Sequence, residues 1–150
     1  MARSDDFYLL GTVPVENFGN AWEALKGFLV PAFRAAKNTD PFILRWLAVA
    51  GVASLWAVYR INPLEPKGAF FTEIIEDVDG RRIMFGHTMS GSDLRRWAHL
   101  AQGAVEAEAR KRNCCAVQIM GRRGLLRIYP GYRIVGEARP GEWLFERVLA

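Results

Sequence analysis

Three small residues, Ser90, Gly91 and Ser92, lie at the start of the longest periodic segment of the chain. That segment, residues 92–112, repeats apolar side chains at intervals of three and four, which predicts a helix. Backbone N–H groups at the start of a helix attract anions, and glycine lets a ligand approach the backbone closely. These residues could therefore hold a phosphate group, although the carboxylate of Asp93 would repel a phosphate at the same N–H groups.

A second group of residues that could take part in binding is cationic. The formal charge of +4 is carried by the second half of the chain, and residues 110–133 contain basic side chains but no acidic one. Such a stretch is a solvated face, a site for a phosphate group, or a surface that docks an acidic protein. We expect Arg122, Arg123 and Arg127 to contact a protein partner, since arginine is enriched at interface hot spots. Nucleic acid fits less well because no exposed aromatic residues are interleaved with the charges.

Other chemistries find little support in the residue types. His87 and His99 lie outside any spacing of metal ligands, and Cys114 and Cys115 project to opposite faces of a strand, so we expect no metal site. The chain contains no Gly-x-Ser-x-Gly turn of the kind that carries a nucleophilic serine. The adjacent cysteines are expected to stay reduced in the core, which favours a cytoplasmic protein.

Chain length and composition predict one domain spanning residues 1–150. With 150 residues, of which 51% are hydrophobic, the chain can bury a core without disulfides or a structural metal. The N-terminal residues lack the apolar stretch of a secretory signal. Residues 42–59 carry one charge, Arg45, over the length of a membrane span. Gly51 divides this window and neither flank has the basic asymmetry of a span, so we expect a short helix and a buried strand instead.

Periodicity predicts a chain that alternates between strands and helices. The expected strands cover residues 8–13, 52–60, 69–76, 81–87, 114–120, 132–139 and 142–149, and the expected helices cover residues 18–37, 41–50, 92–112 and 123–129. We expect Gly27 and Pro31 to kink or split the first helix. Asp40 is expected to cap the second helix, and residues 62–68 are expected to form a loop.

The order strand, two helices, three strands, long helix, strand, short helix, two strands resembles the GNAT (Gcn5-related N-acetyltransferase) fold. Residues 109–114 are similar to the end of the long helix in that family, and Gly131-Tyr132 is similar to the pair that follows its short helix. The resemblance implies one α/β domain with a mixed central sheet of about six to seven strands and helices on both faces. Residues 55–58 and 115–124 look most like GNAT-like proteins encoded among tailed-bacteriophage structural genes.

The resemblance also implies where coenzyme A would bind. Members of the family hold the coenzyme's pyrophosphate at the start of the long helix, with the pattern Arg/Gln-x-x-Gly-x-Gly/Ala, whereas residues 87–94 contain only Gly91. Many members protonate the departing thiolate with a tyrosine four residues before the glycine-aromatic pair, where this chain has Arg127. Arginine does not give up its proton at neutral pH. Tyr129 is two residues further on and is expected to point in another direction.

These departures from the family pattern predict a degenerate coenzyme site. Glu73 or Glu76 could reach the cleft as a base for the amine, but a carboxylate on an exposed sheet face is usually only solvated. We therefore expect no catalytic residue and no cofactor, and a role as a structural or assembly component of a phage or gene-transfer particle. Its partners would be other virion or assembly proteins or a second copy of the chain, in the host cytoplasm and then in the virion.

The alternative is an active enzyme of the bacterial cytoplasm. It would be an acyl-CoA-dependent N-acetyltransferase that binds acetyl-CoA at Ser90, Gly91 and Ser92 and acts on an unknown amine.

Overall fold

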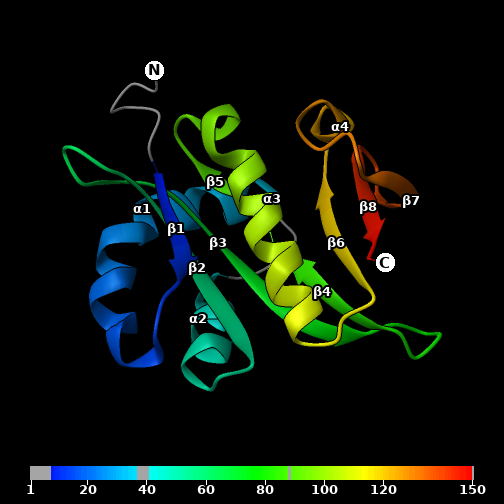
Figure 1. Cartoon of the computed structure of the whole chain (residues 1–150), viewed down its shortest axis with the longest axis horizontal. Helices are drawn as coiled ribbons and strands as arrows, with labels where there is room; N and C mark the ends of the chain where they lie inside the picture. Colours follow the sequence, from blue (N-terminus) through cyan, green and yellow to red (C-terminus); the bar gives the residue numbers. More distant parts are fainter. Residues whose placement is uncertain (1–7, 37–40, 88, 150) are drawn as a thin grey trace.

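Strands and helices alternate along the described parts of the chain, residues 8–36, 41–87 and 89–149, in the computed structural model (Figure 1). The strands are β1 (Tyr8–Thr12), β2 (Ala53–Arg60), β3 (Glu65–Glu76), β4 (Arg82–Gly86), β5 (Ser90–Gly91), β6 (Ala116–Gly121), β7 (Arg133–Arg139) and β8 (Glu142–Val148). The helices are α1 (Phe18–Ala36), α2 (Pro41–Val49), α3 (Leu94–Lys111) and α4 (Leu125–Ile128), with a short 3-10 turn at Val15–Asn17.

A single mixed sheet joins the strands, as expected. Seven strands follow one another in the order β1-β2-β3-β4-β6-β8-β7, and the two-residue β5 pairs with β3 beside this path. Among the strand pairs of the described residues, β4 with β6 is the parallel one, and the others are antiparallel. Since parallel neighbours need a crossover connection, the long helix α3 lies between β4 and β6 in the chain.

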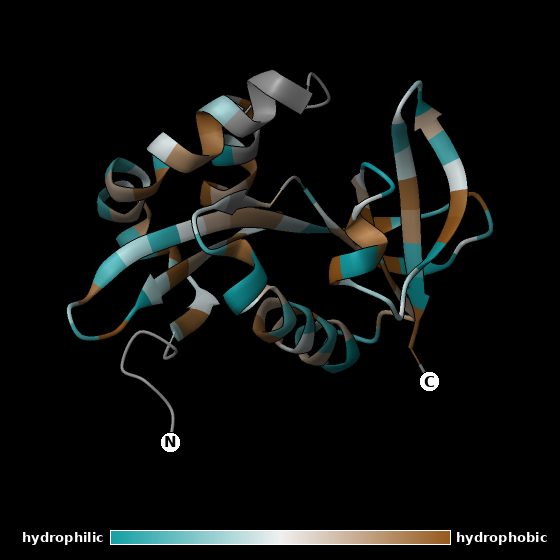
Figure 2. Ribbon diagram, turned by 90° about the horizontal axis from the view of Figure 1, so that it is seen from above, coloured by the Kyte–Doolittle hydropathy of each residue, from teal (hydrophilic) through white to brown (hydrophobic). Residues whose placement is uncertain are grey.

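Helices cover both faces of the sheet, α1 and α2 on one face and α3 on the other (Figure 2). The side chains beneath α1 and α2 form one apolar cluster that includes Leu29, Leu55 and Phe71. A second cluster under α3 includes Phe70, Trp97 and Phe145. Successive residues of β3 belong to different clusters because side chains alternate across a strand.

The apolar window of residues 42–59 is divided as expected. Its first part forms α2 and its second part forms the buried strand β2, and Gly51 takes a positive φ of 80° between them. Within the described residues, no helix is both long enough and apolar enough to cross a membrane. The expected cap at Asp40 lies outside the described residues.

Two expectations about local structure need correction. Helix α1 runs through Gly27 and Pro31 without being split, because buried side chains such as Trp22 and Leu25 hold it against the sheet and outweigh one lost backbone hydrogen bond, whereas a kink stays a prediction. The expected loop at residues 62–68 is shorter, since β3 already begins at Glu65. This start of β3 pairs with β2 across a register shift, which accommodates a proline in the strand.

Candidate active site

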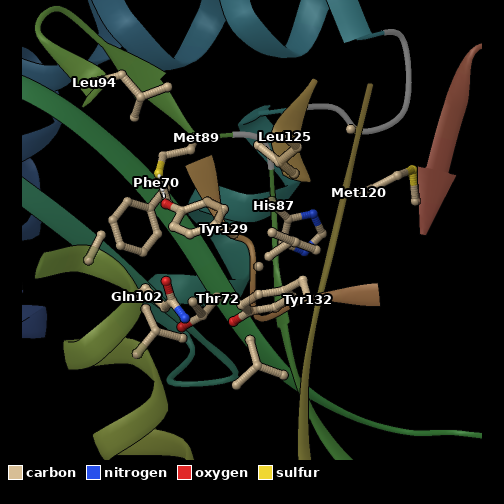
Figure 3. Close-up of a pocket in the computed structure, with 16 residues that line it drawn as sticks. Phe70, Thr72, His87, Met89, Leu94, Gln102, Met120, Leu125, Tyr129 and Tyr132 are labelled. Carbon is tan, nitrogen blue, oxygen red and sulfur yellow. Dashed lines mark hydrogen bonds between the residues drawn. The ribbon is translucent and has the colours of Figure 1, made fainter. Parts of the chain in front are cut away.

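A cavity of about 160 Å³ lies where the parallel strands β4 and β6 stop pairing. Their register runs from Ile83 opposite Ala116 to Gly86 opposite Ile119, after which β4 ends and β6 continues along β8. Helices α3 and α4 close the cavity on one side of the sheet. Sixteen residues line it: Phe70, Thr72, Gly86, His87, Met89, Leu94, Ala101, Gln102, Val105, Val117, Ile119, Met120, Gly121, Leu125, Tyr129 and Tyr132 (Figure 3).

Two buried tyrosines bring hydroxyl groups into this largely apolar cavity. Tyr129 donates a hydrogen bond of 3.1 Å to the thioether sulfur of Met89, and Tyr132 packs against it with ring centroids 5.6 Å apart. Burial raises the pKa of both hydroxyls, and for Tyr132 the nearby Glu106 carboxylate raises it further. Both tyrosines therefore keep their protons at neutral pH.

The expectation that Tyr129 points away from the cleft is wrong. Helix α4 ends at Ile128, and Tyr129 follows it with φ −124° and ψ 73°, outside helical geometry. The direction of the Tyr129 side chain therefore cannot be predicted by assuming that the helix continues to this residue. The side chain points into the cavity. The Pro130-Gly131 pair directly after it was the available sign that the helix could not continue.

A hydrogen-bonded pair, His87 and Glu73, forms part of the cavity's surroundings. His87 lines the cavity, and its Nε2 lies 2.9 Å from Oε1 of Glu73 on β3. The Phe85 ring meets the imidazole edge-on at a centroid distance of 5.0 Å. Burial lowers the pKa of His87, and the Glu73 carboxylate only partly opposes this effect. The imidazole is therefore neutral at pH 7.

The structure brings Ser90, Gly91 and Ser92 to the edge of β3, just before α3. Gly91 has φ 155°, and a Cβ there would come within 2.2 Å of the Lys67 carbonyl oxygen, so only glycine fits at this crossing. Ser92 donates its backbone N–H to the same oxygen over 2.8 Å. The glycine is thus needed for the contact between two chain segments, and a role in binding a ligand stays a prediction.

The N–H groups at the start of α3 are the better candidates for holding an anion. Asp93 is the N-cap residue and takes a left-handed conformation, and its side chain makes no capping hydrogen bond to the first turn. Its carboxylate lies 3.7 Å from Lys67 Nζ, so part of the repulsion expected from Asp93 is offset. Leu94, the first residue of α3, lines the cavity, so the N–H groups at the start of the helix lie next to the cavity.

The three arginines that are expected to bind a partner lie in different environments. Arg127 lines a second cavity of about 180 Å³ beside α3, together with Arg95 and His99. The Arg123 guanidinium lies 4.4 Å from the ring centroid of Trp143, and Arg122 is exposed. Binding of a protein partner by these residues stays a prediction. Within the described residues, no group of three potential ligands could hold a metal ion.

Comparison with known proteins identifies the fold. No family model and no curated protein matches the chain in sequence. In structure, 95% of the chain is similar to PaiA N-acetyltransferase from Thermoplasma acidophilum in complex with coenzyme A, over 99% of that chain, with 9% identity and a TM-score of 0.59. An aminoglycoside 6'-acetyltransferase type Ii matches 93% of this chain over 96% of its own, with 12% identity and a TM-score of 0.68.

A third similar structure is described as a member of the GNAT family. An acetyltransferase of the GNAT family from Listeria monocytogenes matches 95% of this chain over 95% of its own, with 11% identity and a TM-score of 0.59. The chain has the GNAT fold.

These comparisons correct two predictions. The structures that share the fold are named as acetyltransferases, and one holds coenzyme A. The expected role as a virion structural component is therefore wrong, and so is the expectation of no cofactor. The departures from the family pattern in residues 87–94 misled the prediction, because the same segment still contributes His87, Met89 and Leu94 to the cavity. The finer resemblance to phage-encoded proteins finds no support in these structures.

Proposed function

We propose that this protein is an acyl-CoA-dependent N-acyltransferase, which transfers an acyl group from a thioester to an amine. The observation that carries the proposal is the cavity at the end of the β4–β6 pairing, with two protonated tyrosine hydroxyls inside it and the start of α3 beside it. The shared fold with coenzyme-binding acetyltransferases supports the same conclusion.

The residues present fit an acyl coenzyme. The apolar cavity would bind the acyl group and the part of the coenzyme next to the thioester, since most of the side chains that line the cavity, Met89 among them, are apolar. The N–H groups of the first turn of α3 would hold the diphosphate. Arg95 and Arg127, which line the second cavity, would bind the coenzyme phosphate that lies outside the diphosphate. Arg127 belongs to the arginine-rich stretch of residues 110–133, which would thereby have a role in binding the coenzyme.

Tyr129 is the residue best placed to act as the acid. When bound, the coenzyme supplies a thioester whose acyl carbon an amine attacks, yielding an amide and a thiol. The Tyr129 hydroxyl already donates its hydrogen to a sulfur atom, that of Met89, and a thioether is a weak acceptor that is easily exchanged for a better one. Its proton can therefore be directed at a departing sulfur, replacing the tyrosine that is absent at Arg127.

Coenzyme binding is the first test of this function. At 1 mM acetyl-CoA, we expect the melting temperature to rise by about 5–10 °C if the dissociation constant is about 10 µM. Replacing Arg95 or Arg127 with alanine should weaken binding several-fold, and more strongly at low salt. Arg110→Ala, at the far end of α3, is the matched control. An unchanged melting temperature would contradict the proposal.

Turnover is the second test. The protein should acylate at least one member of a panel of peptides, polyamines and aminoglycosides. Tyr129→Phe should lower kcat by roughly 100-fold or more with little change in the KM for acetyl-CoA, because the ring is kept and the proton is lost. Tyr59→Phe changes a half-buried tyrosine on β2 outside the cavity and should leave kcat unchanged. No turnover across the panel would retire the proposal.

A further inference from the structure

The cavity beneath α3 offers more room than a protein core normally contains between its side chains. Its volume is about 160 Å³, whereas the side chains of protein interiors interdigitate and leave few spaces larger than a water molecule. An engineered apolar cavity of about 150 Å³ in another protein binds benzene, a molecule of six carbon atoms. The cavity of this protein, which is also largely apolar, therefore fits an apolar group of about six carbon atoms.

A small side chain on α3 creates this room. Leu94, Ala101 and Val105 recur on the face of α3 that packs on the sheet, and all three line the cavity. Ala101 is fully buried and ends in a methyl group, so the space between the two larger side chains stays open. The large buried Trp97, one turn before Ala101, donates its indole N–H to the Ser92 carbonyl and is not among the described residues that line the cavity.

The cavity has a mouth and an inner end. Met89 and Leu94 are half-buried and line the mouth, next to the start of α3 (Figure 3). Phe70, Ala101 and Val117 are almost completely buried and line the inner end. Leu94 and Ala101 are seven residues apart, which corresponds to about 10 Å along a helix. The inner end therefore extends about two helical turns past the start of α3.

The proton donor lies at the mouth of the cavity. The Tyr129 hydroxyl donates its hydrogen bond of 3.1 Å to Met89, one of the two mouth residues. In the proposed function this hydroxyl protonates the departing sulfur, so the acyl group would extend from the mouth toward the inner end. An acetyl group has one methyl group beyond its carbonyl carbon and would fill only a small part of this space. Unfilled apolar space forfeits packing contacts, which favours a longer chain.

We propose that the acyl donor is a coenzyme A thioester of a straight aliphatic chain of about six carbon atoms, and that Ala101 sets this length. The proposal rests on the proposed function and narrows its acyl group. The carbon–nitrogen bond forms as the carbon–sulfur bond breaks, and the proton lost by the amine replaces the one that Tyr129 gives to the sulfur. One amine and one hexanoyl thioester thus give one hexanoyl amide and one thiol.

The lining favours an uncharged chain. Among the described residues that line the cavity, none is lysine or arginine, and the ionisable ones are His87, Tyr129 and Tyr132. Burial raises the pKa of both tyrosine hydroxyls and lowers the pKa of His87, so all three side chains are neutral at pH 7. A carboxylate at the end of an acyl chain would meet no cation there, and an unpaired buried charge is costly.

Calorimetric binding to the full-length protein, without an acceptor amine, tests the chain length independently of turnover. Each buried CH₂ group should strengthen binding about fourfold, so hexanoyl-CoA should bind at least about tenfold more tightly than acetyl-CoA. Decanoyl-CoA should bind no more tightly than hexanoyl-CoA, because its chain exceeds the cavity. Butanoyl-CoA should bind more tightly than succinyl-CoA, which has the same number of acyl carbons but a terminal carboxylate.

Equal affinities for acetyl-CoA and hexanoyl-CoA would overturn the proposal. An affinity that keeps rising up to decanoyl-CoA, or succinyl-CoA bound as tightly as butanoyl-CoA, would overturn it as well.

Two variants of α3 test the role of Ala101. Ala101→Leu should fill the inner end and lower the affinity for hexanoyl-CoA to that for acetyl-CoA, while acetyl-CoA binds within about twofold of the wild type. Ala107→Leu makes the same change on the exposed face of α3 and should bind the whole series as the wild type does. Val105→Ala adds no volume to the core and should shift the preferred chain from hexanoyl to octanoyl.

Val105→Ala also decides the matter if Ala101→Leu does not fold. An unchanged dependence on chain length in the folded variants would overturn the proposal.

Failure of this proposal is distinguishable from failure of the proposed function. If the wild type binds acetyl-CoA and hexanoyl-CoA equally and acylates amines with both, only the chain length is wrong. If neither thioester binds and no amine is acylated, the proposed function itself is wrong.

Discussion

The two halves of the sheet, on either side of the β4–β6 junction, are held together by different interactions. On the first half, α1 packs on β3 through apolar side chains such as Leu29 and Phe71, both fully buried at 0% exposure. On the second half, the face of β6 and β8 turned away from α3 carries Gln118 and Glu146. The Glu146 carboxylate accepts hydrogen bonds from Gln118 over 3.0 Å and from Arg81 over 2.8 Å.

This difference shows how the fold supports a cavity at the junction. The close-packed side chains of the apolar half restrict the movement of the strands next to Glu73 and His87, so these two residues are held in place. The polar half lets β6 leave β4 and pair with β8 without a second covering helix, since its buried carboxylate is satisfied by hydrogen bonds. We expect stability of the first half to depend on side-chain volume, and that of the second to depend on charge and pH.

The largest expected effect comes from the apolar half. Leu29→Ala should lower the free energy of unfolding by about 3 kcal/mol, since it removes fully buried methyl groups and leaves a cavity beneath α1. Urea unfolding monitored by fluorescence measures this loss. Leu9→Ala changes a leucine that is 54% exposed and should cost less than about 0.5 kcal/mol. Equal losses in the two variants would show that α1 does not pack as described.

Removing the carboxylate of the polar half should have a smaller effect. Glu146→Ala should cost about 1–2 kcal/mol, because Gln118 loses its partner while Arg81 and Arg133 are exposed enough to be solvated. The same unfolding assay applies. A loss as large as that of Leu29→Ala would erase the proposed distinction between the halves.

The pH dependence of stability provides a sharper comparison. Burial alone would raise the pKa of Glu146, but hydrogen bonds from Gln118 and Arg81 outweigh it and hold the pKa below its ordinary value of 4.5. Such a group contributes stability that is present above its unfolded pKa and is lost as the pH falls through its folded pKa. Wild-type stability should therefore decline below about pH 5.

Glu146→Gln should be less stable at pH 7 and should decline less in acid. Glu142→Gln, on the same strand, is the control and should keep the decline in acid, because the Glu146 carboxylate and its partners are unchanged. A wild-type curve that is flat between pH 7 and pH 4 would contradict the role of Glu146.

The smallest expected effect concerns the arginine surface of the polar half. Arg123→Ala should cost about 0.5–1 kcal/mol, because its guanidinium lies over the ring of Trp143. The exposed neighbour Arg122 is the control, and Arg122→Ala should change stability by no more than about 0.5 kcal/mol. If the two variants are equally stable, the contact with Trp143 contributes nothing measurable.

Most elements of the fold were predictable because their patterns are local. The expected strand at residues 8–13 corresponds to β1, and the expected helix at residues 92–112 corresponds to α3. The errors occur where a distant contact decides the outcome. Pro31 stays inside a helix that the sheet supports, and β5 exists because Gly68 and Ala69 offer it a partner.

The candidate site was predictable only in part. The sequence located the start of α3, because small residues before a periodic segment are a local sign. It missed Tyr129 as a cavity residue, whose hydroxyl contacts Met89 forty residues away along the chain. It offered Glu73 only as one of two exposed carboxylates, since nothing local connects it to His87.

The amino-acid sequence by itself determined the order of the elements, because hydrophobic period is a property of neighbouring residues. It also determined where the cations gather. Only the tertiary structure decided that β4 and β6 separate around a cavity, that a histidine and two tyrosines line it, and that a glutamate hydrogen-bonds the histidine. The physical reason is that these contacts join four separate segments, whose proximity depends on the packing of the whole sheet.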